Sequence, residues 1–218
     1  MKFLWGKRVV SSFVTVLALV AVSFTGIATV WAADHGRLVG EDPRRDVPVV
    51  LDGDVGAHAQ IGNRIFVGGD FQQVRRPNGT TITQPNIFAY DINTGLLDES
   101  FRPVVNNAVW ALEVNPRGDA LFVGGRFVMW DGLFVDRLAK LDAFGNRDTN
   151  FQASASAIVR DLAVTNDDVY LAGDFVMVGG EFHAGFAAVD ANTGAVNPGF
   201  GLTWRTRHPQ DSWRGGLW

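Results

Sequence analysis

The sequence predicts an all-β fold made of β-propeller-type blades, each with about four short antiparallel strands, in three repeats that form an incomplete or open arc. The first observation is a motif of apolar residues that ends in Gly-x-Phe and occurs at residues 65–71, 121–127 and 170–175. The second is that short apolar runs are separated by turns rich in Pro, Gly, Asn and Asp, which supply the dihedral angles of tight turns. The third is a period close to 50 residues, which is typical of propeller blades.

Three markers follow one another in the same order in every unit. The residues of the Gly-x-Phe marker are Gly68, Gly69, Phe71, Gly124, Gly125, Phe127, Gly173 and Phe175. An Asp that opens an Asp/Gly turn comes next, at Asp91, Asp142 and Asp190. Each unit closes on a Phe, at positions 101, 151 and 200, and these are 50 and 49 residues apart. The markers define repeats at 48–101, 102–151 and 152–200.

Each repeat is expected to contain four strands. The first strand is apolar, at 109–114 in the second unit and 159–164 in the third, and the Gly-x-Phe strand is second. A third strand, at 137–142 or 184–190, runs into the Asp/Gly turn, and a weak fourth strand ends in the closing Phe. The first unit holds about five extra residues around 75–79, which we expect to lengthen a hairpin loop.

The Gly-x-Phe residues are expected to have a packing role. Because glycine has no Cβ, Gly124 and Gly125 would let a neighbouring strand or blade approach closely. Phe127 and its equivalents would be wedges between blades, since one buried aromatic side chain removes roughly 150–250 Å² from water.

The second unit resembles the delta-60 repeat, a bacterial β-propeller-like repeat family of largely uncharacterised role. The resemblance is carried by residues 109–112, 121–127, 137–142, 145 and 150–151, and in the third unit by 162–164, 173–175, 179–180 and 190. It covers about residues 48–200, and the first unit is more divergent. The resemblance implies a blade fold in an exported or cell-surface protein, and it implies no catalytic residue.

Residues 1–33 have the pattern of a secretion signal, with Lys2, Lys7 and Arg8 before an apolar run and small residues near Ala32. An uncleaved N-terminal anchor is the alternative, and it is the only membrane contact that we predict. Residues 34–47 are interpreted as a polar linker. Both interpretations of the leader predict a secreted or cell-surface location.

The repeat pattern stops after position 200. Residues 201–218 hold three Trp and three Arg without apolar alternation, and we interpret them as an irregular tail or a truncated fourth repeat. An Arg/Trp tail that docks on a membrane surface or a partner is the alternative. Three blades are fewer than the four to eight of closed propellers. We therefore expect a fragment of a longer protein, or self-association through open blade edges, for example two arcs in one six-blade ring.

The candidate ligand-binding residues lie on the predicted first strands. Alignment of the units makes Gly56, Trp110 and Arg160 equivalent, and likewise Ala57, Ala111 and Asp161. The variable and chemically able side chains there are His58, Trp110, Arg160 and Asp161. Simple packing within the blade, or exposure to solvent, is the other interpretation of these residues.

Several other motifs are better explained by turns. Arg117-Gly118-Asp119 is an integrin-type adhesion tripeptide, but a Pro-x-Gly-Asp sequence is ordinary turn chemistry. The carboxylate pairs at 52–54 and 167–168 lack the spaced loop of a calcium site, and the isolated His58 and His183 do not make a zinc pattern. The chain has no cysteine, which excludes disulfides and thiolate chemistry. We expect no catalytic residue, no metal and no cofactor.

Taken together, these features predict an exported, non-catalytic binding or structural module at the cell surface, with a protein or glycan partner. Removing the three leader cations from 19 leaves 16 against 23 acids, a net charge of −7, which argues against nucleic acid. The alternative is a propeller enzyme with its site at the channel mouth, a hydrolase or a quinone-dependent oxidoreductase. The Asp-x-x-Thr-Gly turns at 91–95 and 190–194 resemble those of quinoprotein propellers, but Phe101 and Phe200 stand where those proteins have a docking Trp.

Overall fold

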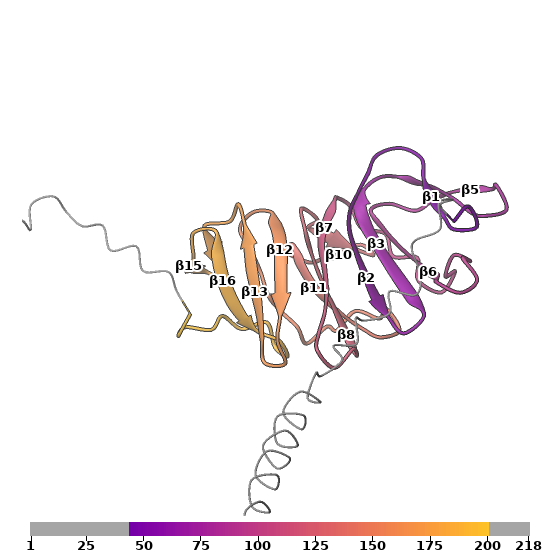
Figure 1. Cartoon of the computed structure of the whole chain (residues 1–218). Coiled ribbons are helices and arrows are strands. Elements are labelled where there is room, and N and C mark those ends of the chain that lie inside the picture. The colour runs from indigo at the N-terminus through magenta and orange to yellow at the C-terminus, as the bar shows by residue number, and fades with distance from the viewer. Residues whose placement is uncertain (1–43, 201–218) are drawn as a thin grey trace, which may run out of the picture. The chain divides into compact units, whose positions relative to one another are not determined.

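A computed structural model describes residues 44–200 of the chain (Figure 1). The predicted leader, most of the linker and the tail at 201–218 lie outside the described residues. Every regular element between residues 44 and 200 is a β-strand, so the all-β prediction is confirmed. This part of the chain contains no helix with the length and apolar character needed to cross a bilayer.

Three antiparallel sheets carry the fold, and all three place their strands in the same order. The strand that contains the Gly-x-Phe glycines lies in the centre of each sheet, between a first and a third strand. The first sheet consists of β2 (Asp54–Ile61), β3 (Arg64–Asp70) and β6 (Ile87–Asp91). The second consists of β7 (Val109–Val114), β8 (Ala120–Gly125) and β11 (Leu138–Asp142). The third consists of β12 (Val159–Val164), β13 (Asp168–Gly173) and β16 (Phe186–Asp190).

The prediction of a fourth strand in each unit is wrong. A single antiparallel bridge to the third strand stands in its place, at Leu97, Arg147 and Val196. The next residues form turns, because the side-chain oxygens of Asp98, Asp148 and Asn197 accept hydrogen bonds from the backbone N–H two residues further on, at 2.9, 2.9 and 3.0 Å. Such local bonds compete with strand pairing.

The closing Phe of each unit packs against the central strand. Ring centroids are 5.1 Å apart for Phe66 and Phe101 and 5.5 Å apart for Phe122 and Phe151, both edge to face. In the third sheet the pair is Tyr170 and Phe200, at 5.2 Å. Edge-to-face pairs add to the stability gained by burial, and so they fix the end of each unit on its own sheet.

Each Gly-x-Phe motif leads into a small hairpin before the third strand. The hairpins are β4 (Gln73–Arg75) with β5 (Thr81–Thr83), β9 (Met129–Trp130) with β10 (Leu133–Phe134), and β14 (Met177–Val178) with β15 (Glu181–Phe182); β1 (Val49–Val50) pairs with β4. The longer loop predicted around 75–79 is confirmed as the β4–β5 connection. The sequence did not predict the other two hairpins.

One side-chain oxygen holds each hairpin in place. Asp52, Asn106 and Ser156 each accept hydrogen bonds from two successive backbone N–H groups at the hairpin start, at 2.7–3.1 Å. Asp52, one of the carboxylates of the 52–54 pair, therefore has a structural partner within its own unit.

Successive sheets pack through their first strands, as Figure 1 shows for the three sheets side by side in chain order. β2 lies against β7, β7 lies against β12, and the central strands β3 and β8 contact the first strand of the following sheet. One buried apolar cluster fills the space between the first and second sheets and another fills the space between the second and third. Phe127 belongs to the former and Phe175 to the latter, and both are fully buried.

Two glycines allow this close approach. A Cβ added to Gly68 would lie 2.5 Å from Cγ1 of Val109, and one added to Gly124 would lie 2.7 Å from Cγ1 of Val159. Both valines are fully buried on the first strand of the next sheet. Real Cβ atoms do not come so close to another carbon, so these two positions require glycine at the observed spacing between sheets.

We predict that Gly124→Ala destabilises the protein by about 1–3 kcal/mol, the usual cost of overpacking a well-packed core. Chemical denaturation monitored by circular dichroism measures this. Truncating the opposing side chain in a Gly124→Ala/Val159→Ala double variant should give a coupling energy of about 0.5–3 kcal/mol in the stabilising direction. Strictly additive costs would contradict the contact.

Candidate functional site

The first strand of every sheet contains a bulge at the same place. The ladder of β2 with β3 skips Gly56, that of β7 with β8 skips Trp110, and that of β12 with β13 skips Arg160. A bulge leaves its residue outside the regular alternation of the strand. Two of the four predicted ligand-binding residues therefore occupy bulges, a placement that the sequence did not predict.

Trp110 lies over the bulge of the preceding sheet. A Cβ on Gly56 would be 2.7 Å from Cε3 of the indole, so the absence of a side chain at Gly56 makes room for this ring. The side chain of Trp110 is half-buried. It thus packs between units and also presents part of its ring to solvent.

Arg160 forms an ion pair within its own sheet. Its Nε and Nη2 donate to Oδ1 and Oδ2 of Asp174 at 2.8 and 2.6 Å. The hydrogen bond from Arg160 lowers the pKa of Asp174, and the hydrogen bond to Asp174 raises the pKa of Arg160. Both side chains are exposed, so the pair is a surface feature of one sheet edge rather than a buried reactive group.

His58 and Asp161 lie on two different sheets, the first and the third. His58 is exposed, although its equivalents Leu112 and Leu162 are buried against the sheet before them. Asp161 is also exposed, whereas its equivalent Ala111 is buried between sheets. The structure therefore does not gather the four predicted residues into one pocket.

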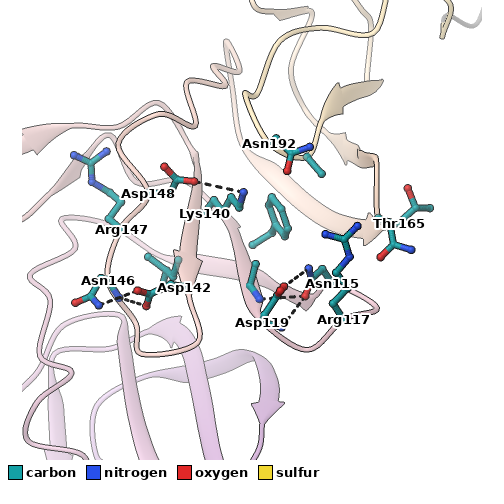
Figure 2. A pocket seen from close by; sticks show the side chains of 15 residues that line it. Asn115, Arg117, Asp119, Lys140, Asp142, Asn146, Arg147, Asp148, Thr165 and Asn192 are labelled. Atoms are coloured by element: carbon teal, nitrogen blue, oxygen red, sulfur yellow. Dashed lines mark hydrogen bonds and ion pairs between the residues drawn. The ribbon is translucent and has the colours of Figure 1, made fainter.

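A hollow does form at the turns between the second and third sheets, and Figure 2 shows the side chains that line it. Its volume is about 400 Å³, within the lower part of the range of small-ligand sites. We call it the turn hollow. Its polar lining residues include Asn115, Arg117, Asp119, Lys140, Asp142, Asn146, Arg147, Asp148, Thr165, Asn166 and Asn192. The sequence predicted turns at Arg117, Asp119, Asp142 and Asn192 and a strand through Lys140, and it predicted no site there.

Lys140 lies at the centre of the turn hollow. Its Nζ is 3.4 Å from Oδ2 of Asp148 and 5.9 Å from the centre of the Phe122 ring. The ammonium group therefore has a carboxylate and an aromatic ring as neighbours, and it contacts them through an ion pair and a cation–π interaction.

The carboxylates of the turn hollow are held by their own turns. Asp119 Oδ1 accepts a hydrogen bond from Asn115 Nδ2 at 2.6 Å, so the adhesion-like tripeptide belongs to an internally bonded turn. Burial acts to raise the pKa of Asp142, but hydrogen bonds from Asn146 and Phe144 bring it below its usual value. Within residues 44–200, the side chains of Arg117, Asn166 and Asn192 make no hydrogen bond, and they remain available to a ligand.

Turns of the same kind hold the other two Asp markers. Oδ1 of Asp91 accepts from Thr94 N and Oγ1, and Oδ1 of Asp190 accepts from Thr193 N and Oγ1, at 2.7–3.1 Å. These hydrogen bonds give the Asp and Thr residues of the Asp-x-x-Thr-Gly sequences a structural role in the turn. Between residues 44 and 200 no group of three or more His, Asp and Glu side chains is placed to hold a metal ion.

No protein-family model matches this chain, and a search of curated proteins finds no relative. The class that the described residues define is an all-β protein of stacked antiparallel sheets.

The Asp markers predict a dependence of stability on pH. Hydrogen bonds from Thr193 lower the pKa of Asp190 below its ordinary value of 3.8. The stabilisation is therefore complete above that value and is lost as the pH falls through the lowered pKa. We expect Asp190→Asn to lower the melting temperature at pH 7, and the difference from the parent to shrink as the pH falls below 3.8, as measured by circular dichroism.

Asp167→Asn is the matched control, because the Asp167 carboxylate accepts no hydrogen bond within the described chain. Its effect on the melting temperature should be small at both pH values. A deficit of Asp190→Asn that stays constant from pH 7 down to pH 2 would contradict the assignment.

Proposed function

We propose that the chain is an exported propeller-type repeat protein that acts as a non-catalytic binding module at the cell surface, with a glycan as its partner. The observation that carries the proposal is the turn hollow, where side chains from two neighbouring sheets combine hydrogen-bond donors and acceptors in one concave surface. Sugar hydroxyl groups both donate and accept hydrogen bonds, so a surface that combines amide, cationic and carboxylate side chains can bind them.

The propeller part of the proposal is supported by the way in which the sheets stack. The first strands of successive sheets lie against one another, and the glycine contacts recur at Gly68 and Gly124. A fan of sheets that meet at their first strands is how propeller blades surround a channel. The resemblance to the delta-60 repeat and the leader pattern support export.

The non-catalytic part is supported by the bonding of the carboxylates. Asp119 and Asp142 are engaged by their own turns, and Asp148 by Lys140. A general acid or base needs a group that is free to exchange a proton with the substrate. The lining side chains without a hydrogen bond within residues 44–200 are instead Arg117, Arg147, Asn166 and Asn192, which would bind by hydrogen bonding without proton transfer.

Isothermal titration of the full chain with a panel of neutral and acidic oligosaccharides tests this function. We expect binding that Asn166→Ala or Asn192→Ala weakens by about tenfold, the effect of losing one hydrogen bond worth roughly 1.4 kcal/mol. Asn63→Ala is the matched control, because Asn63 occupies the β2–β3 turn as Asn166 occupies the β12–β13 turn. It should leave the affinity unchanged.

Two results would overturn the proposal. Release of new reducing ends from any of these sugars would assign an enzyme in place of a binding module. Absence of binding to the whole panel would reject the glycan as the partner.

A further inference from the structure

One face of the third sheet is open among the described residues. We call it the outer face, and its residues are Asp161, Ala163, Tyr170, Ala172 and Phe186. Most of the equivalent residues of the first and second sheets, among them Phe66 and Phe122, are buried under the sheet that follows. On the outer face, Asp161 and Ala163 are exposed and the other three are half-buried. Phe200 covers part of it, with ring centroids 5.2 and 5.1 Å from those of Tyr170 and Phe186.

The first strand of the first sheet presents a second open face. We call it the entry face, and its residues are Val55, His58 and Gln60 on β2. Val55 is 53% exposed, whereas its equivalents Val109 and Val159 have no exposed surface. Among the described residues, Val55 is thus uncovered at the position where Val109 and Val159 pack against the sheet before them.

Two internal contacts show what covers the faces of the first and second sheets that are equivalent to the outer face. Val109 and Leu112 of the second sheet both lie against Gly68. Val159 and Leu162 of the third sheet both lie against Gly124. In both cases the covering residues lie on the first strand of the following sheet, at the positions that Val55 and His58 occupy on the entry face.

We propose that the entry face of a second copy of this chain docks on the outer face, with Val55 of one copy at Ala172 of the other. The proposal rests on the propeller-type stacking proposed above. It names a second copy as the occupant because the internal contacts of the molecule continue directly into this junction.

The polar residues of the two faces complement each other. Inside the molecule, Leu112 lies against Gly68, whose neighbour across the sheet is Ala57. At the junction, His58 takes the place of the leucine, Ala172 that of the glycine, and Asp161 that of the alanine. An apolar pair inside is therefore replaced by an imidazole and a carboxylate, which attract each other and suit a surface that is also exposed in the separate copy.

Such a junction joins different surfaces of the two copies, head to tail. Two head-to-tail junctions of this kind would join the described sheets of two copies into a set of six. Six lies within the usual range of four to eight blades.

Ala172 makes the junction looser than the internal contacts. At Gly124, the position equivalent to Ala172, an added Cβ would lie 2.7 Å from Val159 Cγ1. Val55 must therefore sit farther from Ala172, or turn its side chain away. Ala172→Gly should tighten the self-association of the full chain about tenfold, as measured by sedimentation or light scattering over a range of concentrations.

The absence of cysteine from the chain permits a direct test. An added Cβ lies 3.0 Å from Val109 Cβ at Gly68, and 3.3 Å from Val159 Cβ at Gly124. Disulfides need a Cβ separation of about 3.5–4.5 Å, which the slightly wider junction provides. A mixture of full-length Val55→Cys and Ala172→Cys chains, oxidised mildly, should give a disulfide-linked dimer, and neither chain alone should.

Two controls accompany the mixture. Val55→Cys mixed with Asn78→Cys, in an exposed loop of the first unit, should give no dimer above background. Adding Asp161→Lys to the Ala172→Cys chain should lower the dimer yield several-fold, and His58→Asp in the Val55→Cys chain should restore it.

The junction is rejected if both thiols react with a soluble thiol reagent but no mixed dimer forms. It is also rejected if the thiol at position 172 is protected in the monomer, since another segment of the same chain would then cover the outer face. A monomer that still binds oligosaccharides would overturn the junction and leave the proposed function standing. A mixed dimer that binds no oligosaccharide would support the junction and overturn the proposed function.

Discussion

The approach of each first strand to the central strand of the sheet before it is the contact on which the rest of the structure depends. At Gly68 and Gly124 there is no room for a Cβ, and Val109 and Val159 fill that space. The first strands also pack against each other, and the apolar clusters between sheets form around these contacts. The third strands lie on the far side of each central strand from the first strands. The bulges at Gly56, Trp110 and Arg160 occur on the same strands. Trp110 crosses toward Gly56 only because the sheets are so close.

A second set of hydrogen bonds links each of the first two units to the unit that follows. The residues just before the third strands, Asn86, Arg137 and Gly185, all have left-handed backbone angles, with φ of 63°, 67° and 77°. Their carbonyl groups accept from the second glycine of the Gly-x-Phe motif at 3.0–3.1 Å. The side chains of Asn86 and Arg137 also donate to the carbonyl oxygens of Val105 and Ala155, at 2.8 and 2.6 Å, in the chain that enters the next unit. A single residue thus closes its own sheet and holds the start of the next.

The sequence predicted the first strands at 109–114 and 159–164 to the residue, because their apolar pattern and flanking turns are unambiguous. It did not predict that Arg137 is left-handed, since arginine carries no signal for that conformation. The two-residue strands of the later hairpins are too short to show a period. The predicted fourth strands are broken by side-chain hydrogen bonds that a pattern of apolar residues does not reveal. The turn hollow was missed because its lining comes from several separate turns that only the stacking of two sheets brings together.

The four predicted site residues occupy three successive register positions along the first strands, and the structure separates them by their place in the stack. Trp110 is internal, between the first and second sheets, and so part of its ring is used for packing. His58 and Asp161 stand where other sheets have leucine and alanine, one on the entry face and one on the outer face. Side chains that vary between repeats can therefore reflect position in the stack as well as ligand chemistry. In the proposed head-to-tail junction, His58 and Asp161 would face each other at positions where the internal contacts between sheets are apolar.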